Sequence, residues 1–263
     1  MLAANQPEHA IIGEVTSYLE AMVAELGVEV RLGVSATPAL LQELAADVLV
    51  IATGSEPNLP NQTEDNARQS RELGRQVLPG LPGLNQSFVV SSDQVLSEEV
   101  KLSGKVVLID DNGHWEAAGT AEYLSDQGCR VEIIAGHPLV GADMESGTRT
   151  LFYRRASIKR IRIRTGMIVA EIGDHRVQVA QVFSGGDAVG SGKYILLPGN
   201  EEWIEDVDWV VAVIGRRSRE DLYLEVKALP QFKDVRIERV GDCVAPRLIQ
   251  STIGEAFALA QTF

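Results

Sequence analysis

Short apolar runs separated by a helical stretch form the clearest pattern in the chain. Residues 106–109 are all apolar, residues 131–134 are apolar except for Glu132, and between them Ala117, Ala121 and Leu124 recur at helical spacing. Runs of this kind are typical of strands buried on both faces of a parallel sheet. Two parallel strands joined by a helix require a crossover connection, which is right-handed in nearly all proteins. The pattern therefore predicts an α/β fold with a doubly wound parallel sheet.

The segments before this strand–helix–strand unit carry further periodic stretches. They predict two helices and two strands, over residues 11–26, 28–32, 38–46 and 47–53. Pro57 and Pro60 prevent the last strand from continuing. Residues 55–87 read as a long polar connection, and residues 88–104 as a bridge into the central unit.

After Gly136 the pattern changes to shorter strands separated by glycine-rich turns. A helix is predicted over residues 149–155, and a β-meander inserted in the α/β domain over 158–164, 167–172, 176–183 and 193–197. Residues 209–214 form another buried strand that ends at Gly215. A last strand over 235–240 leads into Gly241 and Asp242, followed by a helix over 250–263.

The turn after residues 106–109 departs from the usual phosphate-binding sequence. A G-x-G-x-x-G turn lets the backbone approach a pyrophosphate at a helix N-terminus. Here the turn reads Asp110, Asp111, Asn112 and Gly113, and Gly119 follows later. Two carboxylates at the phosphate position repel an anion, so weak or absent NAD(P)H binding is predicted. Gly113 and Gly119 then serve tight helix–strand packing, and the aspartates cap the helix start.

Composition narrows the function classes. The chain has 263 residues, a formal net charge of -13 and no apolar run of membrane-spanning length, which favours a cytoplasmic protein without nucleic-acid or membrane partners. Cys129 and Cys243 are too few for a disulfide framework or metal site. No nucleophile–base–orienter set is visible, so hydrolysis has no support and the catalytic residues are unknown.

Four motifs, in order, resemble a known family: VLVIATGSEPNLP, KVVLIDDNGHWEAAG, VVAVIGRR and RVGDCVAPRLIQSTIGEA. They are similar to the C-terminal half of the NADH:flavin oxidoreductase family, which includes trimethylamine dehydrogenase and 2,4-dienoyl-CoA reductase. The resemblance implies Rossmann-like dinucleotide-binding domains. Residues 1–96 plus 226–263 would form an incomplete FAD/ADP-binding domain, and residues 97–225 an NAD(P)-binding-like domain.

The resemblance also implies cofactor-binding residues. Ala52, Thr53 and Gly54 match the second flavin-domain motif, and Gly241 and Asp242 match the motif whose aspartate binds the ribityl chain or the ADP moiety. The other positions that it assigns to cofactor binding are Asp110, Gly113, Gly119 and Gly215. The simpler alternatives are a strand that ends at glycine and a helix-capping aspartate.

Three features of the family bear on the protein partners that this chain would need. Family members carry an FMN-binding barrel, an iron–sulfur cluster and a first glycine-rich strand–turn–helix, which are missing here. Either a second protein chain supplies them or the chain is a truncated fragment. Two functions stay open: the nucleotide-binding portion of a flavin-dependent oxidoreductase that is not complete alone, holding FAD or ADP, and a non-catalytic subunit with a degenerate NAD(P) site.

One surface feature has two interpretations. Six basic residues lie close together in the sequence: Arg154, Arg155, Lys159, Arg160, Arg162 and Arg164. They form either a solvated strand face or a surface that grips a phosphate or an acidic partner.

Overall fold

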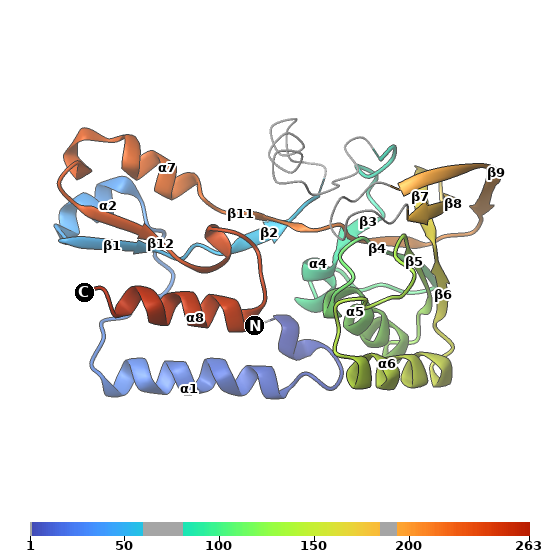
Figure 1. Cartoon of the computed structure of the whole chain (residues 1–263), viewed down its shortest axis with the longest axis horizontal. Coiled ribbons are helices and arrows are strands. Elements are labelled where there is room, and N and C mark those ends of the chain that lie inside the picture. The colour runs from blue at the N-terminus through green and yellow to red at the C-terminus, as the bar shows by residue number, and fades with distance from the viewer. Residues whose placement is uncertain (1, 60–80, 185–193) are drawn as a thin grey trace. The chain divides into compact units, whose positions relative to one another are not determined.

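The computed structural model describes residues 2–59, 81–184 and 194–263 (Figure 1). It divides into two compact units. Unit 1 comprises Met1–Leu26 and Pro57–Gly215, and unit 2 comprises Gly27–Glu56 and Arg216–Phe263. Each is described by itself. The domain boundaries drawn from the sequence, 1–96 plus 226–263 against 97–225, stay a prediction. Most of the predicted connection 55–87 lies outside the described residues.

Unit 1 is built on a five-stranded parallel sheet with the order β3-β10-β4-β5-β6. Its strands are β3 (Val89–Ser91), β4 (Lys105–Asp110), β5 (Arg130–Ala135), β6 (Arg162–Thr165) and β10 (Trp209–Val213). The helices that connect them are α4 (Ser92–Leu96), α5 (Trp115–Asp126) and α6 (Ser146–Ile158). The predicted α/β class with a Rossmann-like parallel sheet is confirmed.

Strand β4 explains why its sequence is an unbroken apolar run. Val106 and Leu108 pack in the core cluster that includes α5 and α6, whereas Val107 and Ile109 pack on the opposite face. All four side chains are at most 4% exposed. Burying each of these side chains stabilises the folded state by roughly 1.5–3 kcal/mol, so this strand contributes strongly to the stability of the unit.

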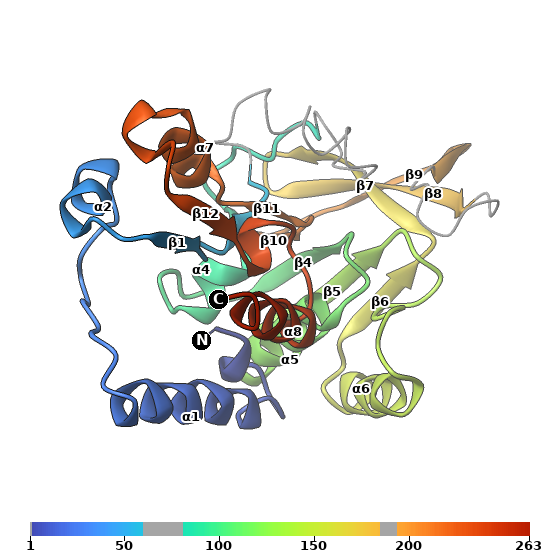
Figure 2. The same cartoon turned by 60° about the vertical axis from the view of Figure 1, so that its left-hand side comes forward.

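The opposite face is covered by the predicted meander. Strands β7 (Met167–Gly173), β8 (Arg176–Ser184) and β9 (Tyr194–Ile204) pair antiparallel. Figure 2 shows α5 and α6 below the five-stranded sheet and this meander above it. One expectation was wrong: residues 158–164 do not form a strand of the meander. Helix α6 continues to Ile158, and β6 joins the parallel sheet beside β5, where Ile163 pairs with Ile133.

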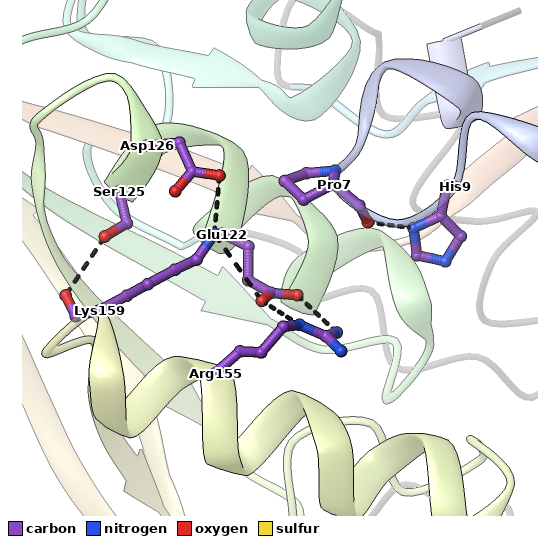
Figure 3. Close-up of polar contacts among 7 residues, drawn as sticks. All are labelled: Pro7, His9, Glu122, Ser125, Asp126, Arg155 and Lys159. Carbon is purple, nitrogen blue, oxygen red and sulfur yellow. Dashed lines mark hydrogen bonds and ion pairs between the residues drawn. The ribbon is translucent and has the colours of Figure 1, made fainter.

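Helices α5 and α6 are joined by buried charge (Figure 3). The carboxylate of Glu122, which is fully buried, accepts hydrogen bonds from Arg155 Nε at 2.6 Å and Nη2 at 2.9 Å. Lys159, just after α6, lies 2.7 Å from Asp126 Oδ2, and the Ser125 hydroxyl donates to the Lys159 carbonyl at 3.3 Å. The basic run therefore fixes the packing of α6 on α5.

The N-terminal segment packs on α5. After a short 3₁₀ turn (Leu2–Asn5), Gln6 Nε2 donates to the Glu116 carbonyl at 3.2 Å. A Cβ added at Gly119 would stand 2.4 Å from Gln6 Oε1, so the glycine makes room for Gln6. The His9 ring meets the Trp115 ring edge-on, with centroids 4.5 Å apart. Helix α1 (Ile11–Glu25) follows and buries none of its residues.

Unit 2 contains a parallel two-stranded sheet, in which β1 (Val48–Ile51) pairs with β12 (Arg236–Arg239). The prediction that these distant segments share one sheet is confirmed. The remaining helices are α2 (Pro38–Leu44), α7 (Asp221–Ala228), a 3₁₀ turn Pro230–Phe232, a second 3₁₀ turn Gly241–Cys243, and α8 (Ile249–Ala260). One face of β1 packs against Val226 and Phe232 through Leu49. Two short strands, β2 (Ser55–Pro57) and β11 (Arg216–Ser218), pair where the chain passes between the units.

The other face of this sheet is open. Val48 and Val50 of β1 are 36% and 45% exposed, and α8 exposes Ile249, Ile253 and Phe257. The predicted strand over residues 28–32 was wrong, because Gly27–Glu56 contains no strand before β1. The apolar residues that alternate along this segment stay in contact with solvent: Val28, Val30, Leu32 and Val34 are all more than half exposed. A strand needs a neighbour to form its ladder, and this segment has none in the described unit.

None of the helices within the described ranges is long and apolar enough to cross a membrane.

Candidate functional site

Ligands of open α/β sheets bind in the crevice outside the carboxyl ends of the strands. In each unit, polar residues and glycines follow the strands at that edge. A ligand site is therefore expected at these two edges, one of which includes the turn between β4 and α5.

Asp110 is the last residue of β4 and is 1% exposed. Its Oδ1 atom accepts hydrogen bonds from the backbone N–H groups of Asn112 at 3.2 Å and Gly113 at 2.9 Å. Helix α5 begins later, with His114 at its N-cap position and no side-chain cap. Asp110 therefore closes the turn and does not cap the helix. The alternative drawn from the sequence, that the aspartates cap the helix start, is wrong for Asp110. The N–H groups of this turn donate to the chain's own carboxylate, where a phosphate would otherwise accept them.

Burial dominates the electrostatics of this turn. It raises the pKa of Asp110 above its usual value, against the hydrogen bonds from Gly113 and Asn112 and the nearby His137. Burial, together with the neighbouring charge of Asp110, raises the pKa of Asp111 to about 7. The Oδ2 atom of Asp110 is buried without a hydrogen-bond partner. The turn thus holds two carboxyl groups that resist ionisation at the position where a pyrophosphate would otherwise bind.

Gly215, which follows β10, lies at the same edge. Its carbonyl accepts the Asn58 N–H at 3.0 Å, and a Cβ at this position would stand 3.2 Å from Asn58 Nδ2 and 3.6 Å from Asn112 Oδ1. Three of the predicted positions, Asp110, Gly113 and Gly215, are therefore brought together. Gly119 is not, because it lies on α5 beneath Gln6.

The second edge belongs to β1 and β12. Ile51 pairs with Arg239, so the turns after the two parallel strands leave from the same end of the sheet. Gly54 and Gly241 both adopt left-handed backbone, with φ of 76° and 77°. Such φ values are open to glycine at little cost. Ala52 and Thr53 are exposed, and the Thr53 hydroxyl donates to the Arg219 carbonyl.

Asp242 stands in the middle of this edge. Its Oδ2 accepts the Ser55 hydroxyl at 2.9 Å, and its Oδ1 accepts the Arg247 N–H at 3.1 Å. Arg216 Nε in turn donates to the Ser55 oxygen at 3.0 Å. The N-cap position of α8 is Leu248, so Asp242 does not cap that helix, and this alternative from the sequence was wrong. A carboxylate offers about four acceptor positions, and two remain for a ligand.

Gly241 carries a further contact. Its backbone N–H donates to Glu255 Oε2 on α8 at 2.7 Å, and the same oxygen accepts Arg247 Nη2 at 2.7 Å. Sequence reasoning missed Ser55, Arg216, Arg247 and Glu255. Two of them had a signal, because Ser55 directly follows Gly54 and Arg216 directly follows Gly215.

The basic run supplies no free cluster at either edge. Arg155 and Lys159 pair with α5 as described, and Arg162 and Arg164 both contact Glu132. Trp115 packs on His9. No group of three or more metal-ligating side chains occurs within the described residues.

Parallel strands with glycine turns at their carboxyl ends define a protein of the Rossmann-like, dinucleotide-binding class. No family model matches the sequence. The chain is 28% identical over 288 residues to N,N-dimethylglycine/sarcosine dehydrogenase of Chromohalobacter salexigens, covering all of this chain and 38% of that protein. It is 28% identical over 223 residues to NADH oxidase of Thermoanaerobacter brockii, covering 81% of this chain and 31% of that one.

A solved structure supports the fold. Histamine dehydrogenase from Rhizobium sp. 4-9 superposes with a TM-score of 0.77 at 19% identity, covering 99% of this chain and 37% of that one. The chain thus spans about a third of the length of the proteins it matches. They are oxidoreductases by name, and this chain is similar to a part of each.

Proposed function

We propose that the chain is the nucleotide-binding portion or subunit of a flavin-dependent oxidoreductase, of the amine dehydrogenase or enoate/dienoyl-CoA reductase type. It holds FAD or ADP at the edge of β1 and β12, next to an electron-transfer centre on another chain or segment. The observation that carries this proposal is the convergence of Gly54, Gly241 and Asp242 at one end of the same parallel sheet.

The residues at this edge fit such a ligand. Asp242 keeps acceptor capacity for ribityl or ribose hydroxyls while Ser55 and Arg247 hold its carboxylate in place. No atom lies within 4 Å of a Cβ built at Gly54, so a ligand can approach the backbone there. A bound flavin would supply the redox chemistry, and the chain's own residues would bind and orient it.

A second candidate is a non-catalytic nucleotide-binding or structural subunit with a degenerate NAD(P) site. The observation that favours it is the Asp110 carboxylate on the N–H groups of Asn112 and Gly113, two donors of the turn between β4 and α5 that a phosphate of NAD(P)H would otherwise use. A bound flavin would favour the first candidate over the second. The visible spectrum of the purified protein detects it, because flavin absorbs blue light and ADP does not.

A partner polypeptide belongs to the proposal. It would supply the strand–turn–helix that β1 and β12 lack, and a flavin-containing barrel with FMN and an iron–sulfur cluster. Support comes from the open apolar face of unit 2, formed by Val48, Val50 and the exposed residues of α8. Two parallel strands alone are a marginal sheet, and parallel sheets are normally covered on both faces.

The test uses Asp242→Ala in the chain together with any polypeptide that co-purifies with it. Removal of a charge-assisted hydrogen bond costs roughly 1.5–3 kcal/mol, so the affinity for FAD or ADP measured by calorimetry should fall more than tenfold. Asp234→Ala is the matched control, since Asp234 is exposed and faces only Lys233 at 3.9 Å. Unchanged affinity with a much lower melting temperature would assign Asp242 a purely structural role.

A further inference from the structure

One oxygen of Glu255 is shared by two donors at the edge of β1 and β12. Oε2 accepts the backbone N–H of Gly241 and the Nη2 of Arg247, each at 2.7 Å. The two donors come from the turn after β12 and from the segment before α8, whereas the carboxylate reaches them from within α8. An anion thus occupies a position formed by a main-chain donor and a guanidinium.

These donors are of the kind that bind phosphate. Arginine presents a rigid fork that matches carboxylate and phosphate oxygens alike, and a backbone N–H in a tight turn adds a fixed partial charge. Arg247 is also held by its neighbours, because its own N–H donates to Asp242 Oδ1 at 3.1 Å and its Nε to the Ala245 carbonyl at 3.1 Å. The guanidinium therefore stays in place when its partner changes.

Glu255 can leave this position at modest cost. Its side chain is 30% exposed and that of Arg247 is 38% exposed, so water can solvate both groups. The Gly241 N–H and then Arg247 lower the pKa of Glu255, which keeps the carboxylate charged near neutral pH. A second anion with more charge and more acceptor oxygens competes directly for the same two donors.

We propose that Gly241 and Arg247 form a phosphate subsite, that Glu255 fills it in the absence of ligand, and that a phosphate group of a bound nucleotide displaces the Glu255 carboxylate. The proposal rests on the proposed function, because the nucleotide's sugar would lie at the neighbouring Asp242. Glu255 then acts as a specificity-determining residue that favours ligands with a phosphate able to compete with it.

The experiment compares ADP with adenosine, which has the same base and sugar and lacks the phosphates. Glu255→Gln keeps the side-chain length and an oxygen acceptor while it removes the charge. ADP affinity, measured by calorimetry, should rise about five- to tenfold, because a like charge no longer occupies the subsite. Adenosine affinity should change less than twofold. Arg247→Gln should lower ADP affinity about tenfold and leave adenosine unchanged.

A control and a second readout complete the test. Glu238→Gln removes a carboxylate that pairs with Arg236 on β12, and it should leave ADP affinity unchanged. In ¹⁵N-labelled protein, the Gly241 amide signal should move on addition of ADP and stay in place on addition of adenosine. If ADP binds but Glu255→Gln leaves its affinity unchanged or lowers it, Glu255 is a structural link and the inference is overturned. If neither ligand binds any variant, the proposed function fails first, and the subsite with it.

Discussion

The guanidinium of Arg155 holds the buried carboxylate of Glu122 by two hydrogen bonds, from Nε and from Nη2. The Glu122 side chain is fully buried and the Arg155 side chain is 24% exposed. Such a pair offsets the cost of taking a carboxylate out of water only while both partners are present. Helix α6 is thus anchored to α5 at a point where the loss of Arg155 leaves Glu122 with the longer contact to Lys159, whose Nζ lies 4.0 Å from Glu122 Oε1.

Arg155→Met should therefore destabilise unit 1 by up to about 3 kcal/mol, because the buried Glu122 loses both hydrogen bonds and keeps only the longer contact with Lys159 Nζ, 4.0 Å away. Chemical denaturation followed by circular dichroism measures the change. Arg154→Met is the matched control, since Arg154 is exposed on the same helix, and it should change stability by less than about 0.5 kcal/mol. Equal effects of the two substitutions would mean that the pair contributes no more than an exposed arginine.

Asp111 makes stability depend on pH. Its pKa is raised from 3.8 to about 7, first by burial and then by the charge of Asp110. The folded protein therefore binds more protons than the unfolded chain between these two values, and the free energy of unfolding falls as pH rises from about 4 to about 7. Asp111→Asn removes the ionising group, so the variant should match the wild type near pH 4 and exceed its stability at pH 8.

The size of this effect is on the order of a few kcal/mol, because each unit of pKa shift corresponds to about 1.4 kcal/mol. Denaturation curves at pH 4, 6 and 8 measure it. Asp174→Asn serves as the control, because Asp174 is exposed and should show a constant difference from the wild type across the range. A constant difference for Asp111→Asn as well would contradict the raised pKa.

The turn between β4 and α5 should bind NADH weakly or not at all. The N–H groups of Asn112 and Gly113 already donate to Asp110 Oδ1, so they are not open to a phosphate, and above about pH 7 the ionised Asp111 adds a negative charge beside them. Replacing Asp110 and Asp111 with glycine frees the N–H groups of Asn112 and Gly113 and removes the Asp111 charge, so NADH affinity measured at pH 8 should rise at least tenfold. NADH fluorescence reports binding, and Asp174→Gly, at an exposed position between β7 and β8, is the control. Micromolar binding by the wild type would contradict this account.

Gly119→Ala should loosen the N-terminal segment. The added methyl group would meet Gln6 Oε1 at 2.4 Å and force Gln6 away from the Glu116 carbonyl and the Thr120 hydroxyl. Loss of these hydrogen bonds costs roughly 1–2 kcal/mol, and proteolysis of the segment should become faster. Gln6→Gly should remove the clash, so the double variant should be no less stable than Gln6→Gly alone.

Sequence reasoning predicted the elements whose pattern is fixed by burial on both sides. The runs that became β4 and β5 were correctly assigned to a parallel sheet, and the run that became β10 was correctly predicted to be a buried strand. The prediction of a strand failed where the local sequence pattern favours a strand but the fold provides no neighbouring strand. Residues 28–32 alternate like a strand but have no neighbour to pair with. Ser91 caps α4 with a reciprocal Gln94 contact, a signal present in the sequence but not used.

Only some residues of the candidate site could be predicted, namely those that directly follow a predicted strand. Gly54, Gly241 and Asp242 follow two strands directly, so their common edge could be inferred once the strands were paired. The Glu255 contact could not, because it joins positions whose proximity depends on where α8 packs. Helix α7 was also missed, although Val226 at its centre is fully buried against β1.

The pairing of Val48 with Arg236 has a consequence for synthesis of the chain. Ribosomes add about 5–20 residues per second, so the roughly 190 residues between these partners take on the order of 10–40 s to appear. Throughout that interval β1 is without β12, while β4, β5 and β6 of unit 1 emerge one after another and can pair as they leave the ribosome, and β10 follows before β12. Unit 1 should therefore fold first, and β1 should be a segment that chaperones meet on the nascent chain.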